Sequence, residues 1–262
     1  MNRLLSPPII RGAVGLVIAV LLAEAISVSG LVDEQLVPSV FLVLGRAGQL
    51  AVDPEFLGDV VSTLRSWAGG LLGAVLVAVP VGVVLGSLPG VNAATRTLVE
   101  FLRPIPSVAL IPLAIIMFSP IGDWLMTGSL VFYASLWPIL INTVYALQDV
   151  DPVAKETLRS FGFGPLAMLW RVALPSAAPF IATGVRLAAS IGIIVVISAE
   201  LLSGGSGGIG VFLLKSNSAA GHTDVILAGA LWSGVIGLVI NMLLVRAERM
   251  AFRWYHERTA AV

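Results

Sequence analysis

The sequence contains no cysteine and little charge. Only 11% of its 262 residues are Asp, Glu, Lys or Arg, and its two lysines are Lys155 and Lys215. Without cysteine, disulfides and thiolate chemistry are excluded. Neither lysine follows the glycine that a phosphate-binding P-loop requires, so we do not expect this chain to hydrolyse ATP. With two histidines and no cluster of His, Cys and carboxylate residues, the sequence predicts neither a metal site nor an enzyme.

Most of the chain consists of long apolar runs. Hydrophobic residues make up 58% of the chain, and the mean hydropathy is +1.00. Lipid offers the backbone no hydrogen-bond partners, so runs that cross roughly 30 Å of hydrocarbon are expected to be helices. We therefore predict an all-α membrane protein with a single domain, 1–262, and six transmembrane helices. The expected spans are about 12–31, 60–86, 104–119, 124–146, 178–201 and 225–245, with a polar loop at 149–175.

The basic residues orient these spans. With the N-terminus inside, 12 of the arginines and lysines lie on the inner side, and only Arg46, Arg65 and Lys215 lie outside. Basic loops stay in the cytoplasm, so both termini and the loop 149–175 are predicted to be cytoplasmic. The basic and aromatic tail 246–262 is expected to contact the inner leaflet.

The loop 149–175 is the most polar part of the chain. Asp151 followed by Pro152 is typical of a helix start, Gly162 and Gly164 predict a break, and Pro165 can begin a second helix. Leu174–Pro175 is expected to end that second piece before the next apolar run. Such a two-part insert between spans indicates either a docking element for a soluble partner or an ordinary amphipathic loop.

The spacing within this loop resembles a known pattern. Glu156-Thr157-Leu158, Gly162 and, after Val172, Leu174-Pro175 are similar to the "EAA" loop of permease subunits of type I ABC importers. Thr157 and Leu158 replace the two alanines of that pattern.

The resemblance implies that the loop is a coupling helix in the cytosol and that the chain is a permease of the bacterial plasma (inner) membrane. The implied partners are a second copy of the permease, two ABC ATPase subunits and an extracytoplasmic substrate-binding protein, with membrane lipid around them and no nucleic acid. The chain itself would carry no cofactor, since ATP and Mg would be bound by the partner ATPase.

Two further motifs resemble the branch of this family that imports nitrate, sulfonates and taurine. One is Ser62, Arg65 and Gly69. The other begins at Arg103 and runs through Pro104, Ile105, Pro106 and Ser107 to Leu113. The prolines of the second motif exclude a regular helix, and irregular backbone at membrane depth must face protein or a water-filled cavity. Ser107 is therefore a candidate to line the path of a small anion.

Three other polar residues are candidates for the translocation path. Arg65 could face the path or reach the outer headgroups. Asn142 could contact substrate or make an interhelical hydrogen bond. Glu200, before the glycine-rich run 204–210, could belong to an outer gate, contact the binding protein or lie at a solvated helix end. Gly69, Gly73, Gly82 and Gly86 indicate close packing of the second span.

Two other function classes remain as alternatives. A secondary transporter, not powered by ATP, would favour inverted repeats and acidic residues at the midplane. An intramembrane serine hydrolase would use Ser206 of the GxSxG match, but neither His222 nor His256 is placed convincingly as a base.

Overall fold

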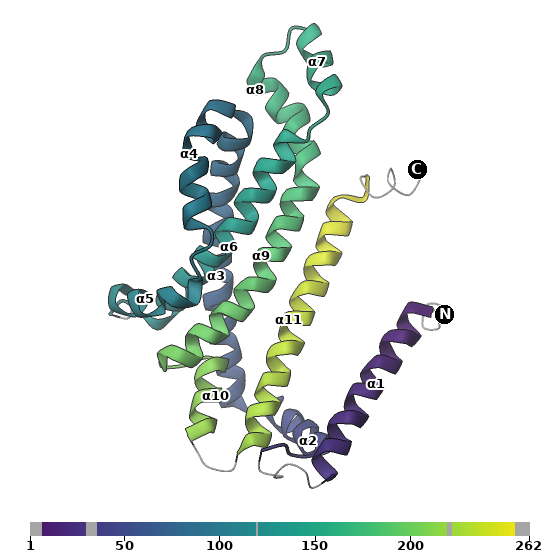
Figure 1. Ribbon diagram of the computed structural model, residues 1–262, viewed down its shortest axis with the longest axis vertical. Coiled ribbons are helices and arrows are strands. Elements are labelled where there is room, and N and C mark those ends of the chain that lie inside the picture. The colour runs from purple at the N-terminus through teal and green to yellow at the C-terminus, as the bar shows by residue number, and fades with distance from the viewer. Residues whose placement is uncertain (1–6, 30–35, 119, 219–221, 255–262) are drawn as a thin grey trace.

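The computed structural model describes residues 7–29, 36–118, 120–218 and 222–254, and within them every regular element is a helix. Figure 1 shows the arrangement. The elements are α1 Pro7–Val28, α2 Val40–Leu50, α3 Pro54–Ser87, α4 Pro89–Leu102, the 3₁₀ turn η1 Ser107–Leu110, α5 Ile111–Phe118, α6 Asp123–Gln148, α7 Pro152–Ser160, α8 Pro165–Met168, the π turn η2 Leu169–Ala173, α9 Leu174–Ser203, α10 Ile209–Ser218 and α11 Thr223–Ala251.

Helices α3, α6 and α9 form the centre of the molecule. Their contact depends on small residues: a Cβ built on Gly82 would lie 2.7 Å from Cβ of Thr143, and one on Gly184 would lie 2.7 Å from Cβ of Asn142. Without side chains there, the backbones approach closely, as membrane helices do where small residues face each other. The indole of Trp67 on α3 adds a polar tie by donating to the Ala189 carbonyl at 2.9 Å.

The glycine prediction for α3 is correct for Gly73, Gly82 and Gly86 and shifted by one residue at Gly69. Gly82 and Gly86 face α6 at distances that leave no room for a Cβ. At the other end Gly70, rather than Gly69, faces the backbone of Gly128. Gly69 and Gly70 are adjacent, so the sequence allows either of them to face α6, and the packing of α3 on α6 places Gly70 there.

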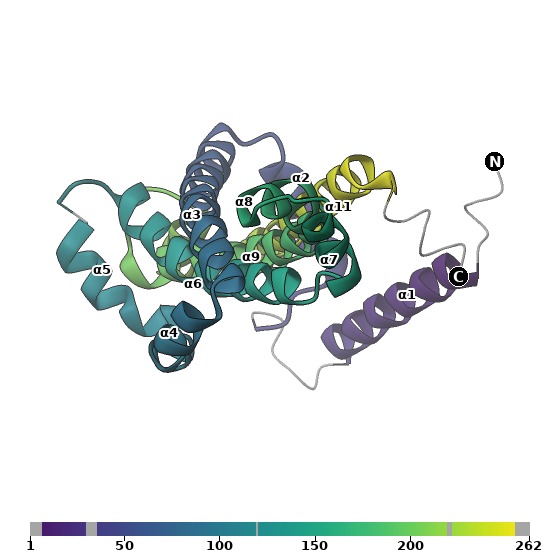
Figure 2. The ribbon, with the colours of Figure 1, turned by 90° about the horizontal axis from the view of Figure 1, so that it is seen from above.

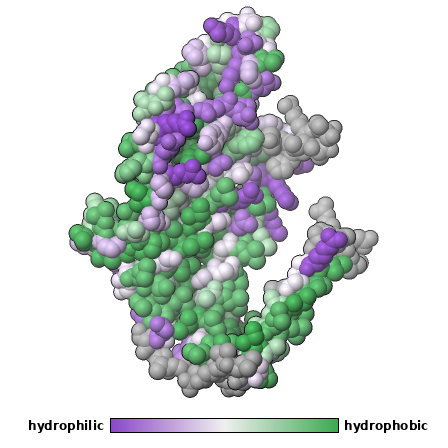
Figure 3. Space-filling view, viewed as in Figure 1, coloured by the Kyte–Doolittle hydropathy of each residue, from purple (hydrophilic) through white to green (hydrophobic). Residues whose placement is uncertain are grey.

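The two ends of the bundle differ in polarity. One end carries α7 and α8, and the opposite end carries α2 and α10, which we call the α7 end and the α10 end (Figure 1). Hydrophilic residues gather toward the α7 end, and hydrophobic ones cover the middle of the body (Figure 3). At about 1.5 Å per residue, the 34-residue α3 is about 51 Å long, more than the hydrocarbon thickness.

The third span is not the single run expected at 104–119. Its straight helical part, α5, has 8 residues, or about 12 Å, which cannot cross a bilayer. Instead α4 and the η1–α5 segment meet at an angle of 78°, because Pro104 and Pro106 stop α4 and break the ladder of backbone donors. Five described helices are long and apolar enough to cross a membrane, and counting this bent pair as one gives six.

Helix α1 stands apart from the bundle in two perpendicular views (Figures 1 and 2). It is held at its C-terminal end, where the Glu24 carboxylate accepts from the Ser39 hydroxyl at 2.9 Å and from the Val40 amide at 2.8 Å. Helix α2 packs against α11, and Trp232 of α11 donates to the Ala47 carbonyl. The predicted basic tail lies, from residue 255 on, outside the described residues.

We predicted that Leu174–Pro175 ends the second piece of the polar loop, and that prediction is wrong. Residues 165–203 form one continuous apolar helical run. The π turn η2, Leu169–Ala173, precedes Pro175, and a widened turn accommodates a residue that cannot donate to the helix ladder.

Candidate functional site

The α7 end carries the predicted coupling loop as a helix, a tight turn and a second helix. Asp151 caps α7, and its carboxylate accepts from the Val153 amide at 2.8 Å, as the Asp–Pro pair predicts. The break after α7 is made by Gly162, whose φ of +78° lies in the left-handed region that side chains disfavour. The Phe163 amide then donates to the Leu158 carbonyl at 3.1 Å and closes the turn.

The tip exposes large apolar side chains together with Glu156. Phe161 is 76% exposed and Trp170 is 66% exposed. The carboxylate of Glu156 and the side chain of Thr157 also face outward, although the Thr157 hydroxyl donates to its own helix at the Val153 carbonyl. Leu158 is half-buried. A protruding surface that mixes apolar and charged groups suits contact with another protein.

The base of the tip is fixed to the bundle. Leu174 packs against a buried apolar cluster formed by the ends of α6 and α9, which includes Leu147, Val150 and Ala177. Lys155 adds a polar tie, because its ammonium donates to the Leu147 carbonyl at 3.3 Å. A force applied to the tip is therefore passed to both α6 and α9.

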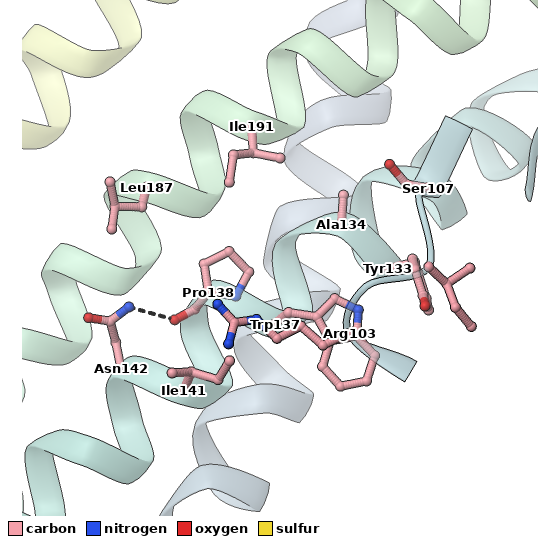
Figure 4. Close-up of a pocket in the computed structure, with 11 residues that line it drawn as sticks. Arg103, Ser107, Tyr133, Ala134, Trp137, Pro138, Ile141, Asn142, Leu187 and Ile191 are labelled. Carbon is pink, nitrogen blue, oxygen red and sulfur yellow. Dashed lines mark hydrogen bonds between the residues drawn. The ribbon is translucent and has the colours of Figure 1, made fainter. Parts of the chain in front are cut away.

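A cavity of about 480 Å³ lies where α4, η1, α6 and α9 meet (Figure 4). Its polar lining residues are Arg103, Ser107, Tyr133, Trp137 and Asn142. The structure thus brings together two of the predicted path residues, Ser107 and Asn142, from segments 35 positions apart. Arg103 begins the predicted proline motif and also lines the cavity, a role that was not predicted for it.

Asn142 makes no interhelical hydrogen bond within the described part of the chain, which was one of the two alternatives for it. Its Nδ2 donates to the Pro138 carbonyl in its own helix at 2.8 Å. Residues four apart lie on one face of a helix, so this short side chain reaches the carbonyl of the preceding turn without crossing to a neighbour.

The other two candidates, Arg65 and Glu200, lie at the α10 end and do not line this cavity. Arg65 is exposed, and its guanidinium carbon lies 5.2 Å from the ring centroid of Trp124. Glu200 is not at a solvated helix end, because it is only 3% exposed. The glycine-rich segment folds back over the end of α9 and covers it.

That glycine segment, residues 203–210, is held by carboxylates and a hydroxyl from three helices. Glu200 accepts from the Gly210 amide at 3.0 Å and from the Thr63 hydroxyl at 2.9 Å. Asp59 accepts from the Gly208 amide at 2.7 Å. Asp123 accepts from the amide and the hydroxyl of Ser206 at 2.7 and 2.6 Å. The side-chain partner of Ser206 is thus a carboxylate, which gives no support to the hydrolase alternative.

Residues 78–253 match the family described as the binding-protein-dependent transport system inner membrane component. The chain belongs to this family. It is therefore an ABC importer permease subunit, and the secondary-transporter alternative is not supported.

Similar proteins carry related descriptions. An ABC transporter permease protein of Methanocaldococcus jannaschii is 32% identical over 76% of this chain and 74% of its own length. The bicarbonate transport system permease protein of Synechococcus elongatus is 28% identical over 80% of this chain and 73% of its own length. The taurine transport system permease protein of Escherichia coli is 28% identical over 86% of this chain and 79% of its own length.

Solved structures share the fold. A chain of an alginate ABC transporter matches with a TM-score of 0.64 at 17% identity, covering 95% of this chain and 98% of that one. A chain of the MetNI methionine ABC transporter matches with a TM-score of 0.61 at 18% identity, covering 81% and 97%. At these identities the likeness establishes the ABC importer permease fold alone.

Proposed function

We propose that this permease forms the path for a small anion and is driven by a separate ATPase that docks on the α7–α8 tip. The observation that carries the proposal is the tip itself, exposed at its surface and packed firmly onto α6 and α9 at its base. Glu156, Thr157, Leu158 and Gly162 belong to the docking surface, while Leu174 and Pro175 join it to α9. ATP and Mg are bound by the ATPase, and this chain carries no cofactor.

A second copy of the permease completes the path. The cavity beside α6 is open on one side, and α1 exposes apolar side chains around most of its described surface. Both features suit a homodimer in a lipid bilayer, since each copy presents one half of a path. Two ATPase subunits then dock, one on each tip.

The α7 end faces the cytoplasm, as do both termini, and the α10 end receives a substrate-binding protein. The distribution of arginine along the chain supports this orientation. The glycine segment at the α10 end provides a surface of backbone and carboxylates for that partner.

The cargo is a small solute with an anionic oxygen group, as in bicarbonate or the sulfonate of zwitterionic taurine, which the relatives' descriptions name, or in nitrate, which the resemblance of the sequence motifs implies. Transport follows alternating access. Closure of the ATPase dimer on ATP draws the two tips together, and because each tip is packed on α6 and α9, these helices move as rigid bodies. The inner side of the path closes as the outer side opens, and ATP hydrolysis reverses the movement.

The first test is purification of the tagged chain in mild detergent, with bound proteins identified by mass spectrometry. We expect an ATPase subunit with a Walker A motif. The substitution Phe161→Ser should abolish its recovery, because Phe161 is an apolar side chain of the tip. The matched control is Phe41→Ser on α2, a phenylalanine with 71% exposure at the opposite end of the bundle.

Recovery of the chain without an ATPase, or equal loss of the ATPase from both variants, would refute docking at the tip. ATP-dependent uptake by the reconstituted complex tests the cargo. Labelled bicarbonate, taurine and nitrate are compared with a neutral and a cationic amino acid, and preference for either amino acid would refute the anion assignment.

A further inference from the structure

The cavity between α4, η1, α6 and α9 combines one positive charge with several hydrogen-bond donors. Arg103 forms no ion pair within the described part of the chain. The indole nitrogen of Trp137 is buried without a hydrogen-bond partner among the described residues, so Trp137 lines the cavity with other atoms of its side chain. Ser107 supplies a hydroxyl and Asn142 an amide, whose second hydrogen is not used by its bond to Pro138.

No carboxylate lines this cavity among the described residues. The nearest acidic residue along the chain, Glu100, accepts instead from Arg96 at 2.7 Å. Arg103 is exposed, and no carboxylate of the described lining competes with an incoming anion for its charge. The electrostatics of the site therefore favour an anion with several acceptor oxygens.

The position of Arg103 is fixed by the fold. Arg103 ends α4, directly before the prolines that turn the chain into η1. The Tyr133 hydroxyl of α6 donates to the Leu102 carbonyl at 2.6 Å, and the Tyr133 ring packs edge-on against Trp137 with centroids 5.7 Å apart. In Figure 4, Arg103, Trp137 and Asn142 come from two different elements around one hollow.

The cavity is large enough to hold a small anion. Small-molecule sites occupy about 300–1,000 Å³, and this cavity is about 480 Å³. The remaining lining is apolar, with Ile141, Leu187 and Ile191 facing the same space. A low-polarity surround strengthens the interaction of an anion with Arg103.

We propose that this cavity is a contact site for the transported anion within the permease, with Arg103 as its charge and Ser107 and Asn142 as hydrogen-bond donors. The inference rests on the proposed function and deepens it, because it assigns part of the selection for anions to this chain and not only to the binding protein. One arginine per copy holds an anion weakly enough for it to leave again, as conduction requires.

The absence of cysteine permits a direct test of charge in the cavity. Ser107→Cys introduces the only thiol of this chain. In the purified complex, its modification by an anionic methanethiosulfonate (the ethylsulfonate) is compared with that by a cationic one (the ethyltrimethylammonium). We expect the anionic-to-cationic rate ratio to fall about tenfold on Arg103→Gln and to persist on Arg103→Lys, because the effect is electrostatic.

The matched control is Arg96→Gln, which removes an equal charge from the exposed face of α4. It should leave the ratio unchanged. Taurine, nitrate or bicarbonate at millimolar concentration should slow modification in the Ser107→Cys chain but not in the chain that also carries Arg103→Gln. Equal ratios with and without Arg103, or an equal effect of Arg96→Gln, would overturn the proposal.

The same anion chemistry occurs in lipid headgroups, so labelling is repeated in detergent and in phosphatidylglycerol vesicles. Protection by the soluble anions in detergent supports the transported solute. Protection that requires phosphatidylglycerol overturns the proposal in favour of a lipid anchor.

Uptake by the complex reconstituted with its ATPase and binding protein gives an independent result. Arg103→Gln should lower the maximal rate about tenfold and change the apparent KM less than twofold, since capture from outside belongs to the binding protein. Arg103→Lys should recover much of the rate. Wild-type uptake by Arg103→Gln would overturn the proposal. A wild-type chain that recovers no ATPase and transports no anion would refute the proposed function instead, and the thiol ratios would still decide the charge preference of the cavity.

Discussion

Substitution of Gly162 tests the coupling role of the tip most sharply. Gly162 has a φ of +78°, and a Cβ built there meets nothing within 4 Å. The penalty of a side chain is therefore conformational rather than steric. A left-handed residue costs roughly 1–2 kcal/mol, and a β-branched one lies at the upper end of that range. A cost of about 2 kcal/mol corresponds to about a 30-fold loss in the population of the native turn.

The expected result is a permease that reaches the membrane but couples poorly to its ATPase. Gly162→Val should leave the membrane level of the protein unchanged, because the turn lies outside the buried clusters of the bundle. ATP-dependent uptake should fall about tenfold or more, since the docking surface on α7 and α8 depends on this turn. Gly162→Asn should be much milder, because asparagine tolerates the left-handed region.

Gly164→Val is the matched control. Gly164 lies two residues further on, has an extended conformation with φ −73° and ψ 167°, and likewise has no atom within 4 Å of a built Cβ. Valine is compatible with that backbone. Membrane level is measured by immunoblot, ATPase recovery by affinity purification and transport by uptake into vesicles. Wild-type uptake by Gly162→Val, or equal damage by Gly164→Val, would refute the reasoning.

Three further changes test the packing and polar contacts of the bundle. Glu200→Ala should lower the thermal stability of the purified permease, because it leaves buried donors unsatisfied at about 1–3 kcal/mol each, whereas Glu200→Gln keeps an acceptor and should cost less. Gly82→Val should reduce the amount of folded protein in the membrane, since its Cβ meets α6 at 2.7 Å. Tyr133→Phe should cost about 1 kcal/mol and slow uptake, because it releases the Leu102 carbonyl beside the cavity.

For each of these three predictions, a specific result would refute it. Equal melting temperatures for Glu200→Ala and Glu200→Gln would show that the carboxylate does not hold the glycine segment. Gly58→Val provides the control for Gly82→Val, because a Cβ on Gly58 of the same helix meets nothing within 4 Å. Equal losses at both positions would exclude helix contact as the cause. Unchanged uptake by Tyr133→Phe would show that the bend does not depend on this bond.

The sequence was sufficient to predict the features that depend only on neighbouring residues. The Asp151–Pro152 start and the glycine break after α7 follow from capping and from backbone freedom, and both occur in the structure. The all-helical membrane fold follows from the length of the apolar runs, since lipid leaves the backbone no other way to satisfy its polar groups. The spacing from Glu156 to Pro175 was enough to indicate the family.

Other features depend on contacts between distant segments, which no local pattern contains. The π turn before Pro175, the 78° bend between α4 and α5 and the choice of Gly70 over Gly69 result from packing of whole helices. Glu200 becomes buried only because a segment beyond it folds back.

The sequence by itself determined that this chain spans a membrane as helices and carries a polar loop in two helical pieces, because hydropathy and turn chemistry act over a few residues. Only the tertiary structure decided which polar groups share a space. Arg103 and Asn142 lie 39 positions apart, and they face one cavity because the proline bend turns the end of α4 onto α6. A cavity is formed by several elements at once, so it exists only after they have packed.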